Sequence, residues 1–313
     1  MKKILIVDPV HEFAINELKK KFEVVYHLHP SNEEFRYLIK DVDAVVLRSG
    51  VKINKDIINA GKRLKIIARA GVGVDNIDIT AAKEKNIIVF NIPNISFSSV
   101  AELTFGLMLS ITRKISLADS QLKKNIWRKS ELYGNELNSK SIGIVGLGRI
   151  GGRVAEIAKG FGMNIIACVK DDSFERRKAL KELGIEIVSL QELLKKADII
   201  TLHVPLNEET RNLITKKELM LMKNNSFIIN MSRGGVINEK DLYEILKNNI
   251  IAGAASDVFV KENEENPLFN LENFVATPHI GAMSYESQEQ IAKILVKNII
   301  NCSEGKDIQN RIC

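Results

Sequence analysis

The sequence predicts an α/β protein with two parallel β-sheets, each covered by helices on both faces. Short runs rich in β-branched residues alternate with amphipathic helical patterns from the first residue onward, and this alternation is typical of parallel sheets. The 313 residues are enough for two domains, because one domain usually has roughly 100 to 200 residues. Hydrophobic residues make up 45% of the chain and charged residues 27%, so each domain has apolar material for a core.

Two series of strands, separated by a helical stretch, support this division. Strands of the first series are expected at residues 3–7, 24–27, 44–47, 65–68 and 87–90. Strands of the second series are expected at residues 141–145, 164–169, 199–202, 226–230, 251–256 and 274–276. Because the strand pattern starts again after a long interruption, we expect two sheets rather than one.

Two helices define the predicted domain boundaries. Apolar residues between 98 and 123 recur at helical spacing, which predicts one long connecting helix with Ser98 or Ser99 as its N-cap. A last helix, at residues 287–301, is too short to begin another domain, and we expect it to pack on the first one. The predicted domains are therefore residues 1–98 with 286–313, and residues 99–285.

Composition limits the classes of partner. Basic residues exceed acidic residues by 45 − 39 = 6, and they form scattered runs that are typical of solvated helix faces, so no nucleic-acid partner is expected. No apolar stretch is long enough to span a membrane, and no membrane partner is expected. Cys168, Cys302 and Cys313 form no paired motif, which favours a reducing, cytoplasmic compartment. His27 and His29 lack a supporting cysteine or carboxylate cluster, so no metal site is expected.

A glycine-rich turn follows the first strand of the second series. Gly146, Gly148 and Gly151 form a GxGxxG motif between that strand and a helical pattern. The first glycine allows a tight turn, the second allows a pyrophosphate to approach the backbone, and the third allows the helix to pack on the strand. The free N–H groups at the start of the helix attract phosphates. The arrangement predicts a Rossmann-like domain that binds a dinucleotide.

The residue that usually selects the cofactor is missing. Proteins that prefer NAD commonly place Asp or Glu at the end of the second strand, where it binds the adenosine ribose, whereas this chain has Val169. Either Asp171 or Asp172 binds the ribose instead, or Lys170 accommodates the 2′-phosphate of NADP. We expect NAD, with NADP as the alternative.

Three further segments hold residue types suited to oxidation of a hydroxy acid. They are NMSRGGVINEKDL with Arg233, ASDVFVKENEENPL with Glu262, and ATPHIGAMS with His279. With GLGRIG, RAGVGVDNID and SVAELTFGLML, they make the chain resemble the D-isomer-specific 2-hydroxyacid dehydrogenases, and most of all the phosphoglycerate dehydrogenases of that family. The resemblance implies a flavodoxin-like substrate domain, an NAD(P)-binding domain and an active site in the cleft between them.

The chemistry itself asks for these residue types. Oxidation of a 2-hydroxy acid requires a base for the hydroxyl proton, and histidine suits this task at neutral pH, so His279 is the expected acid–base residue. The resemblance assigns to Glu262 the carboxylate that orients the histidine ring. Arg233 would bind the substrate carboxylate through its planar guanidinium. The family commonly has proline directly after this glutamate, but here proline comes later, so Glu264 or Glu265 is the alternative.

The resemblance also implies a set of cofactor contacts. Besides the three glycines, this set comprises Arg149, Ile150, Val169, His203, Val204, Pro205, Met231, Ser232, Arg233, Asp257, His279, Gly281 and Ala282, with Thr104 as a weaker member. His203 ends a strand that is expected to face the cofactor, although a lone histidine there is as often structural. Asp257 would accept a hydrogen bond from the nicotinamide carboxamide, unless it caps a helix.

Arginines in the first domain indicate a phosphorylated substrate. Arg48 and Arg69 each follow a strand of the first series, and guanidinium groups bind phosphate through paired hydrogen bonds. In the resembled enzymes, arginines in such segments face the substrate phosphate, and the backbone around Val72 and Gly73 binds the substrate carboxylate. The expected reaction is therefore the NAD-dependent oxidation of 3-phosphoglycerate to 3-phosphohydroxypyruvate, the first step of the phosphorylated serine pathway.

Two other functions stay open. Glyoxylate, hydroxypyruvate and other D-2-hydroxyacid reductases share the same two-domain core. A dinucleotide-sensing binding protein, like the corepressors built on this fold, is more remote because Arg233, Glu262 and His279 are all present. The resemblance implies a homodimer formed through the coenzyme domain. Because the chain ends at Cys313, we expect no feedback by serine through a further regulatory domain.

Overall fold

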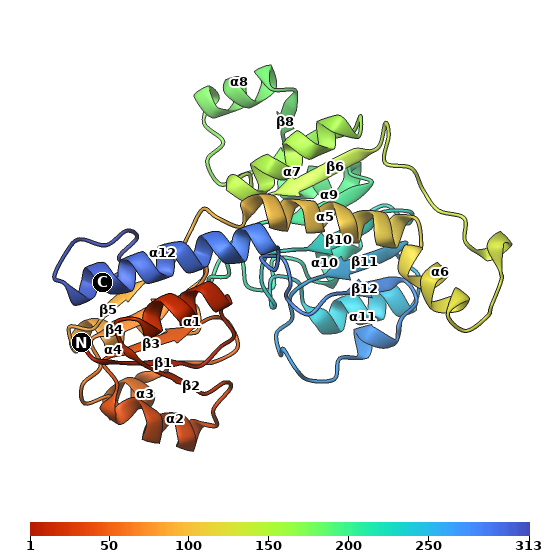
Figure 1. Cartoon of the computed structure of the whole chain (residues 1–313). Coiled ribbons are helices and arrows are strands. Elements are labelled where there is room, and N and C mark those ends of the chain that lie inside the picture. The colour runs from red at the N-terminus through yellow and green to blue at the C-terminus, as the bar shows by residue number, and fades with distance from the viewer. The chain divides into compact units, whose positions relative to one another are not determined.

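The computed structural model describes all 313 residues and divides them into two compact units. Unit 1 comprises Met1–Ser96 and Met283–Cys313, and unit 2 comprises Phe97–Ala282. The predicted domain boundaries lie only a few residues further along the chain. Each unit contains one parallel sheet with helices on both faces (Figure 1), so the α/β architecture with two Rossmann-like sheets is confirmed.

The sheet of unit 1 has the flavodoxin strand order. Its strands are β1 (Lys3–Ile6), β2 (Glu23–Tyr26), β3 (Ala44–Leu47), β4 (Ile66–Arg69) and β5 (Ile88–Phe90), arranged as β2-β1-β3-β4-β5. All four strand pairs are parallel. Every residue of β3 is buried, as expected for a central strand that is covered on both faces.

Helices cover both faces of this sheet. One face carries α1 (Glu12–Lys19) and the C-terminal α12 (Tyr285–Ser303), which lie side by side (Figure 1). The other carries α2 (Asn32–Leu38), the short turn η1 (Ile39–Asp41), α3 (Lys55–Ala60) and α4 (Ile79–Glu84). The apolar face of α12, with Ile291, Leu295 and Ile299, packs in one core cluster with Ile4 and Ile6 of β1. The last helix therefore returns to the first domain, as predicted.

The sheet of unit 2 has the order of a dinucleotide-binding fold. Its strands are β6 (Ser141–Val145), β7 (Asn164–Cys168), β8 (Ile185–Ile187), β9 (Ile199–Leu202), β10 (Phe227–Asn230), β11 (Gly253–Ser256) and β12 (Phe274–Ala276), arranged as β12-β11-β10-β9-β6-β7-β8. Counted from β6, the first six strands follow the order 3-2-1-4-5-6, which reverses beside β6, and ligands bind at that reversal. β8 was not predicted from the sequence.

Two layers of helix enclose this second sheet. The core on one face includes α5 (Phe97–Thr112), α7 (Arg149–Gly160) and α8 (Phe174–Glu182). The core on the other face includes α9 (Leu190–Lys196), α10 (Lys216–Leu219), α11 (Glu239–Lys247) and the turn η3 (Pro267–Asn270). An arm containing α6 (Ile115–Leu122) and the turn η2 (Lys129–Glu131) extends from the end of α5 (Figure 1).

The long connecting helix was predicted wrongly in two respects. It breaks into α5 and α6, because Lys114 adopts a left-handed conformation with φ of 56° that an α-helix cannot continue through. Its N-cap is neither Ser98 nor Ser99, since both lie inside α5. The Ser99 hydroxyl instead donates to the Gly281 carbonyl oxygen at 2.7 Å. None of the helices is both long and apolar enough to cross a membrane.

Candidate active site

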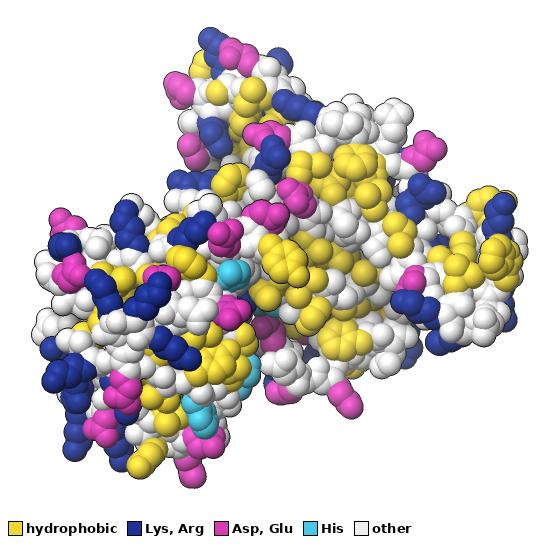
Figure 2. Space-filling view, viewed as in Figure 1, with side chains coloured by type: hydrophobic (Ala, Val, Ile, Leu, Met, Phe, Trp, Pro, Cys, Tyr) yellow, Lys and Arg dark blue, Asp and Glu magenta, His cyan; other side chains and the backbone are white.

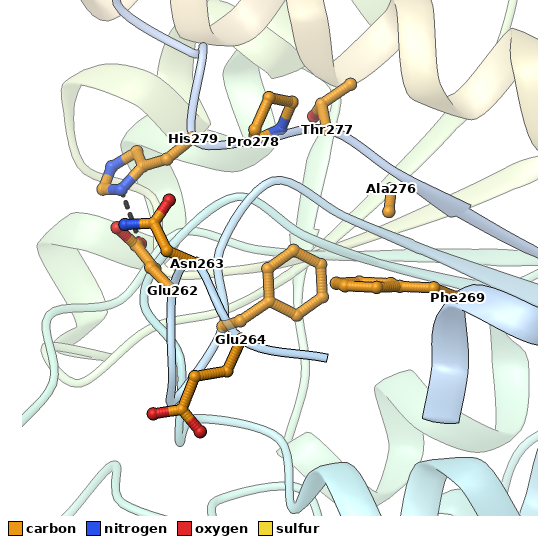
Figure 3. Close-up of a pocket in the computed structure, with 9 residues that line it drawn as sticks. Glu262, Asn263, Glu264, Phe269, Ala276, Thr277, Pro278 and His279 are labelled. Carbon is orange, nitrogen blue, oxygen red and sulfur yellow. Dashed lines mark hydrogen bonds and ion pairs between the residues drawn. The ribbon is translucent and has the colours of Figure 1, made fainter. Parts of the chain in front are cut away.

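His279 and Glu262 meet in unit 2, in the loops that follow β12 and β11. The Nδ1 atom of His279 lies 2.7 Å from Oε1 of Glu262 (Figure 3). An ionised carboxylate can only accept, so Nδ1 carries the proton and donates it, which leaves Nε2 to exchange a proton with a ligand. The two side chains are about one-third exposed, at 30% and 34%. The structure thus brings the predicted pair together.

The dyad lines a cavity of about 310 Å³. Phe259, Phe269, Ala276, Thr277 and Pro278 supply much of the rest of its wall, together with Asn263 and Glu264 (Figure 3). Glu264 was the alternative partner for the histidine, but its carboxylate pairs with Lys261 at 2.8 Å. Glu262 is therefore the glutamate that contacts the ring.

Asp257 holds the loop that carries His279. Its Oδ1 accepts from the Thr277 hydroxyl at 2.6 Å and from the Ile280 N–H at 2.8 Å, and its Oδ2 accepts from the Gly281 N–H at 2.8 Å. Burial raises the pKa of Asp257, and these hydrogen bonds oppose the rise. The bonds bracket His279, which has a left-handed backbone with φ of 54°. Asp257 is 2% exposed and caps no helix. Its hydrogen bonds in the structure hold the loop of His279.

The loop of Arg233 is organised by the last residue of β10. The Asn230 side chain accepts from the Ser232 N–H at 3.0 Å and donates to the Arg233 carbonyl at 3.0 Å. Arg233 itself donates from Nη1 to the Ser232 carbonyl at 2.8 Å. A Cβ on Gly234 would overlap the backbone of Phe259, so the loops that carry Arg233 and Glu262 pack backbone against backbone.

The glycine-rich turn has the shape that a dinucleotide pyrophosphate needs. Gly146 has φ of 92°, and a Cβ there would lie 2.6 Å from the carbonyl oxygen of His203. A Cβ on Gly151 would overlap the carbonyl oxygen of Gly146, whereas one on Gly148 would meet nothing within 4 Å. The turn is thus closed on the protein side and open at Gly148, where α7 begins and presents its unpaired N–H groups. These residues fit a dinucleotide.

The residue that follows β9, next to the glycine-rich turn, is a second indication of a ligand site at this edge of the sheet. His203 lies just after β9, and its Nε2 is 2.9 Å from the Thr201 hydroxyl. Its buried Nδ1 has no hydrogen-bond partner in the protein. Burial lowers the pKa of His203 to about 3, so the ring is neutral at physiological pH. A neutral ring with one unsatisfied nitrogen, beside the glycine-rich turn, is consistent with a ligand at this edge.

The residues after β7 are engaged with other protein groups. Lys170 pairs with Glu209 at 2.7 Å, and Asp172 pairs with Arg177 at 2.7 Å. Asp171 accepts from the Ser173 N–H at 3.2 Å, and this contact lowers its pKa. All of these groups are exposed. Each exposed pair is weak enough to exchange for a ligand, so both alternatives for the ribose stay open.

The other predicted cofactor residues differ in how accessible they are. Arg149 and Pro205 are exposed, and the partly buried members are Ile150, Val169, Val204 and Ala282. Met231 and Ser232 are each 6% exposed. Thr104 has no exposed surface, and its hydroxyl donates to the Val100 carbonyl within α5 at 2.8 Å. The Thr104 side chain is thus part of the packing of α5.

Unit 1 places Arg48 at the C-terminal edge of its own sheet. The Arg48 N–H donates to Oδ2 of Asp8 at 2.6 Å, and its guanidinium contacts the Met283 sulfur at 3.0 Å. Burial lowers the pKa of Arg48, and the Asp8 charge partly opposes this, yet a guanidinium stays protonated under all ordinary conditions. Asn76 donates to the Arg48 and Val51 carbonyls at 2.6 Å each. The segment after β3 is thus held from two sides.

Arg69 has a different environment. It is 8% exposed and donates from Nη1 to the Ala70 carbonyl at 3.1 Å. A Cβ on Gly71 would overlap its guanidinium, so Arg69 shapes the loop that follows β4. In that loop Val72 is exposed, and its carbonyl accepts from the Asn91 side chain at 2.6 Å. Gly73 is partly buried.

Asp8 and Asn76 were not predicted as site residues from the sequence. Asp8 is 1% exposed and lies just after β1, where a buried carboxylate needs partners that only the folded chain supplies. Its position directly after the apolar run at 3–7 was the available signal. Asn76 lies inside the RAGVGVDNID motif, and its role depends on a loop that is distant in sequence.

The chain is similar to known proteins of one family. The family model for the NAD-binding domain of D-isomer-specific 2-hydroxyacid dehydrogenases matches residues 105–281. D-3-phosphoglycerate dehydrogenase of Methanocaldococcus jannaschii is 46% identical over 312 residues, which are 99% of this chain and 59% of that protein. Hydroxypyruvate reductase of Thermotoga maritima is 43% identical over 302 residues, which cover 95% of this chain and 97% of that protein.

A solved structure extends the likeness to three dimensions. An acyclic imino acid reductase in complex with NADPH and D-arginine superposes with a TM-score of 0.85 at 34% identity, covering 99% of this chain and all of that chain. The present chain spans about three fifths of the phosphoglycerate dehydrogenase that it matches. Since the family model covers more than half of the chain and the relatives match nearly all of it, this protein belongs to the D-isomer-specific 2-hydroxyacid dehydrogenase family.

Proposed function

We propose that the protein oxidises 3-phosphoglycerate to 3-phosphohydroxypyruvate with NAD. The observation that carries the chemistry is the hydrogen bond of 2.7 Å between His279 and Glu262, together with an arginine in a loop that packs on the loop of the glutamate. When bound, the dinucleotide supplies the hydride acceptor. Side chains of the protein bind the substrate and move the proton.

His279 takes the hydroxyl proton on Nε2 during oxidation and returns it during reduction. Glu262 keeps the ring in one tautomer and stabilises the imidazolium that forms. Arg233 binds the substrate carboxylate and polarises the oxygen on C2 through its planar guanidinium. Acid–base help of this kind is worth about 10² to 10⁴ in rate, or roughly 3 to 5 kcal/mol.

The phosphate is assigned to unit 1. Arg48 supports this assignment because its backbone is fixed by Asp8 and Asn76 while its guanidinium has only a weak sulfur acceptor. Arg69 is assigned a supporting role, because it shapes the loop whose backbone at Val72 and Gly73 would bind the substrate carboxylate.

A steady-state comparison tests the substrate. We expect higher kcat/KM for 3-phosphoglycerate with NAD, and for the reverse reaction, than for glyoxylate or hydroxypyruvate with NADH or NADPH. Arg48→Ala should lower kcat/KM for the phosphorylated pair much more than for glyoxylate. Arg36→Ala is the matched control, because Arg36 is an exposed arginine of the same unit whose partner is Asp56. Equal losses on both substrates would refute the phosphate assignment.

One observation favours a second candidate. The hydroxypyruvate reductase of Thermotoga maritima matches over almost its whole length, which supports a reductase of small 2-keto acids. Under that function the dyad and Arg233 keep their roles, and unphosphorylated keto acids give the higher efficiency. Absence of turnover on every 2-hydroxy acid and 2-keto acid would instead favour a dinucleotide-sensing binding protein.

We also propose a homodimer formed through unit 2. The arm with α6 carries exposed apolar residues, among them Ile115, Leu122, Trp127 and Tyr133, and hydrophobic side chains are visible on its surface in Figure 2. Trp127 and Tyr133 are 82% and 84% exposed, and apolar groups on one segment mark interaction sites. Light scattering should give the mass of a dimer, and Trp127→Ser should shift it toward the monomer; a monomeric wild type would refute the proposal.

A further inference from the structure

The loop that carries Glu262 has few anchors of its own. Residues 261–265 are all exposed, and Asn263 has a left-handed backbone with φ of 66°. The ion pair between Lys261 and Glu264 lies on the surface, where such pairs contribute little. Yet the Glu262 carboxylate must stay within hydrogen-bond distance of His279 for the pair to act as a unit. Some group outside the segment has to hold it.

Glu239, the first residue of α11, provides that hold. Its Oε1 accepts from the Val260 N–H at 2.6 Å, and its Oε2 accepts from the Asn266 side chain at 2.9 Å. These two contacts lie on either side of Glu262 along the chain. One carboxylate therefore closes the loop at both ends, with each oxygen used once.

The carboxylate is not occupied by its own helix. Asn238 caps α11 by accepting from the Asp241 N–H at 3.2 Å, so the start of the helix has its partner already. Asn266, in turn, accepts from the Leu268 N–H at 3.1 Å and begins η3. The contacts of Glu239 thus join α11 to the start of η3 across the loop.

We propose that Glu239 is a positioning residue for the Glu262–His279 pair. It contacts neither member, and it acts by restricting the backbone on both sides of Glu262. The same backbone segment packs on Gly234, next to Arg233, so the restraint also steadies the contact between the two catalytic loops. A small displacement of a catalytic group costs rate out of proportion to the contact that is lost.

The test combines kinetics with a double-mutant cycle. Glu239→Ala should lower kcat by roughly ten- to a hundredfold and leave KM for the dinucleotide within about twofold, since the glycine-rich turn is untouched. Glu239→Gln keeps one acceptor and should recover part of the loss. In a Glu262→Gln background the effect of Glu239→Ala should largely disappear, because neighbours that act as a unit are not additive. A full, additive loss in that background would overturn the proposal.

Glu244→Ala is the matched control. Glu244 is an exposed glutamate of the same helix whose carboxylate contacts no loop, so this variant makes the same change of charge and should keep the kcat of the wild type. Thermal unfolding of all variants separates loss of fold from loss of positioning. If Glu239→Ala proves too unstable to measure, Glu239→Gln carries the cycle alone.

A second readout does not depend on the proposed function. Hydrogen exchange of residues 259–267 should be faster in Glu239→Ala and Glu239→Gln than in the wild type and in Glu244→Ala. This measurement needs no substrate, and the kinetic ratios are taken on whichever keto acid the wild type reduces best. A wild type without turnover would thus count against the proposed function, whereas unchanged exchange in that loop would count against the role of Glu239.

Discussion

In each of the two sheets, an aspartate joins two neighbouring strands at their N-terminal ends. In unit 1, Asp43 precedes β3, accepts from the Lys2 and Lys3 N–H groups at 2.7 and 3.0 Å, and pairs with Arg63 at 3.1 Å. In unit 2, Asp198 precedes β9, accepts from the Ser141 N–H at 2.8 Å and pairs with Lys223 at 2.8 Å. Each aspartate joins the first strand of its sheet to the neighbour at which the strand order reverses.

The sheets differ at the opposite ends of the same strands. β1 is followed by the buried Asp8, which fixes the backbone of Arg48, whereas β6 is followed by Gly146 and a turn that is open at Gly148. The common edge stabilises the fold, and the divergent edge is the one at which open α/β sheets place their ligands. The comparison therefore teaches that the scaffold repeats while the chemistry is added at the carboxyl ends of the strands.

The largest expected effect comes from a substitution in the candidate active site of unit 2 that leaves both sheets intact. His279→Ala should lower turnover by about 10² to 10⁴, because His279 is the proposed proton carrier and is the one histidine that lines the cavity. Thermal unfolding should change little, since the ring is partly exposed. His27→Ala, on unit 1, is the control and should keep full activity. A smaller loss than tenfold for His279→Ala would break the assignment of acid–base chemistry to this edge.

The second prediction concerns the turn that distinguishes β6 from β1. Gly151→Ala places a Cβ against the Gly146 carbonyl oxygen, and the forced shift of backbone should cost about 1–3 kcal/mol and weaken binding of the dinucleotide. Gly160→Ala changes the same helix where a Cβ meets nothing, and it should raise stability by about 0.5–1 kcal/mol. Thermal unfolding measures the stability of the two variants, and calorimetric titration with NADH measures their affinity for the dinucleotide. Equal affinities for the two variants would contradict the steric argument.

The buried strands were the part of the fold that the sequence predicted best. The runs at 44–47, 141–145 and 199–202 match the observed strands residue for residue, because a strand covered on both faces needs an apolar run with few alternatives. β8 was missed because only Ile185 and Ile187 mark it and charged helices surround it. The break at Lys114 left no trace, since the helical spacing of apolar residues continues through Leu117 and Leu122.

Sequence patterns also predicted only part of the candidate site. Local motifs identified Arg233, Glu262 and His279, because each lies directly after a strand or in a loop with recognisable chemistry. Of the groups that hold these loops, Asp257 was predicted as a cofactor contact or a helix cap and not as an anchor of the His279 loop, and Glu239 was not predicted. Their partners come from other loops, and sequence patterns carry little information on which loops meet.

The third prediction tests the two aspartates that join strands at their N-terminal ends. Asp43→Asn and Asp198→Asn should each lower the free energy of unfolding by about 1–3 kcal/mol, more for Asp43, whose side chain is 5% exposed against 24%. For both, burial raises the pKa, but hydrogen bonds and the cationic partner outweigh it and the net pKa is lowered. This stability is thus present above about pH 4 and is lost as pH falls through the folded-state pKa.

Chemical denaturation at pH 7 and at pH 3 measures this difference. The gap between wild type and each variant should shrink at the lower pH, because the wild-type carboxylates are then becoming protonated. Glu33→Gln removes an exposed carboxylate of α2 that lies away from the sheet edge, and it gives the baseline for loss of one charge. A gap that stays constant with pH would show that the aspartates act through packing alone.

The smallest expected effect concerns the choice between NADH and NADPH at the glycine-rich turn of unit 2. Arg176, on α8, donates to the Leu147 carbonyl of the glycine-rich turn at 3.4 Å, and its side chain is exposed. Its charge would attract the 2′-phosphate of NADP, so Arg176→Ala should lower kcat/KM with NADPH by a few-fold, on the order of an exposed ion pair, and leave NADH nearly unchanged. Lys178→Ala, on the same helix, is the control. An equal loss with both cofactors would mean that Arg176 supports the turn itself rather than selecting between dinucleotides.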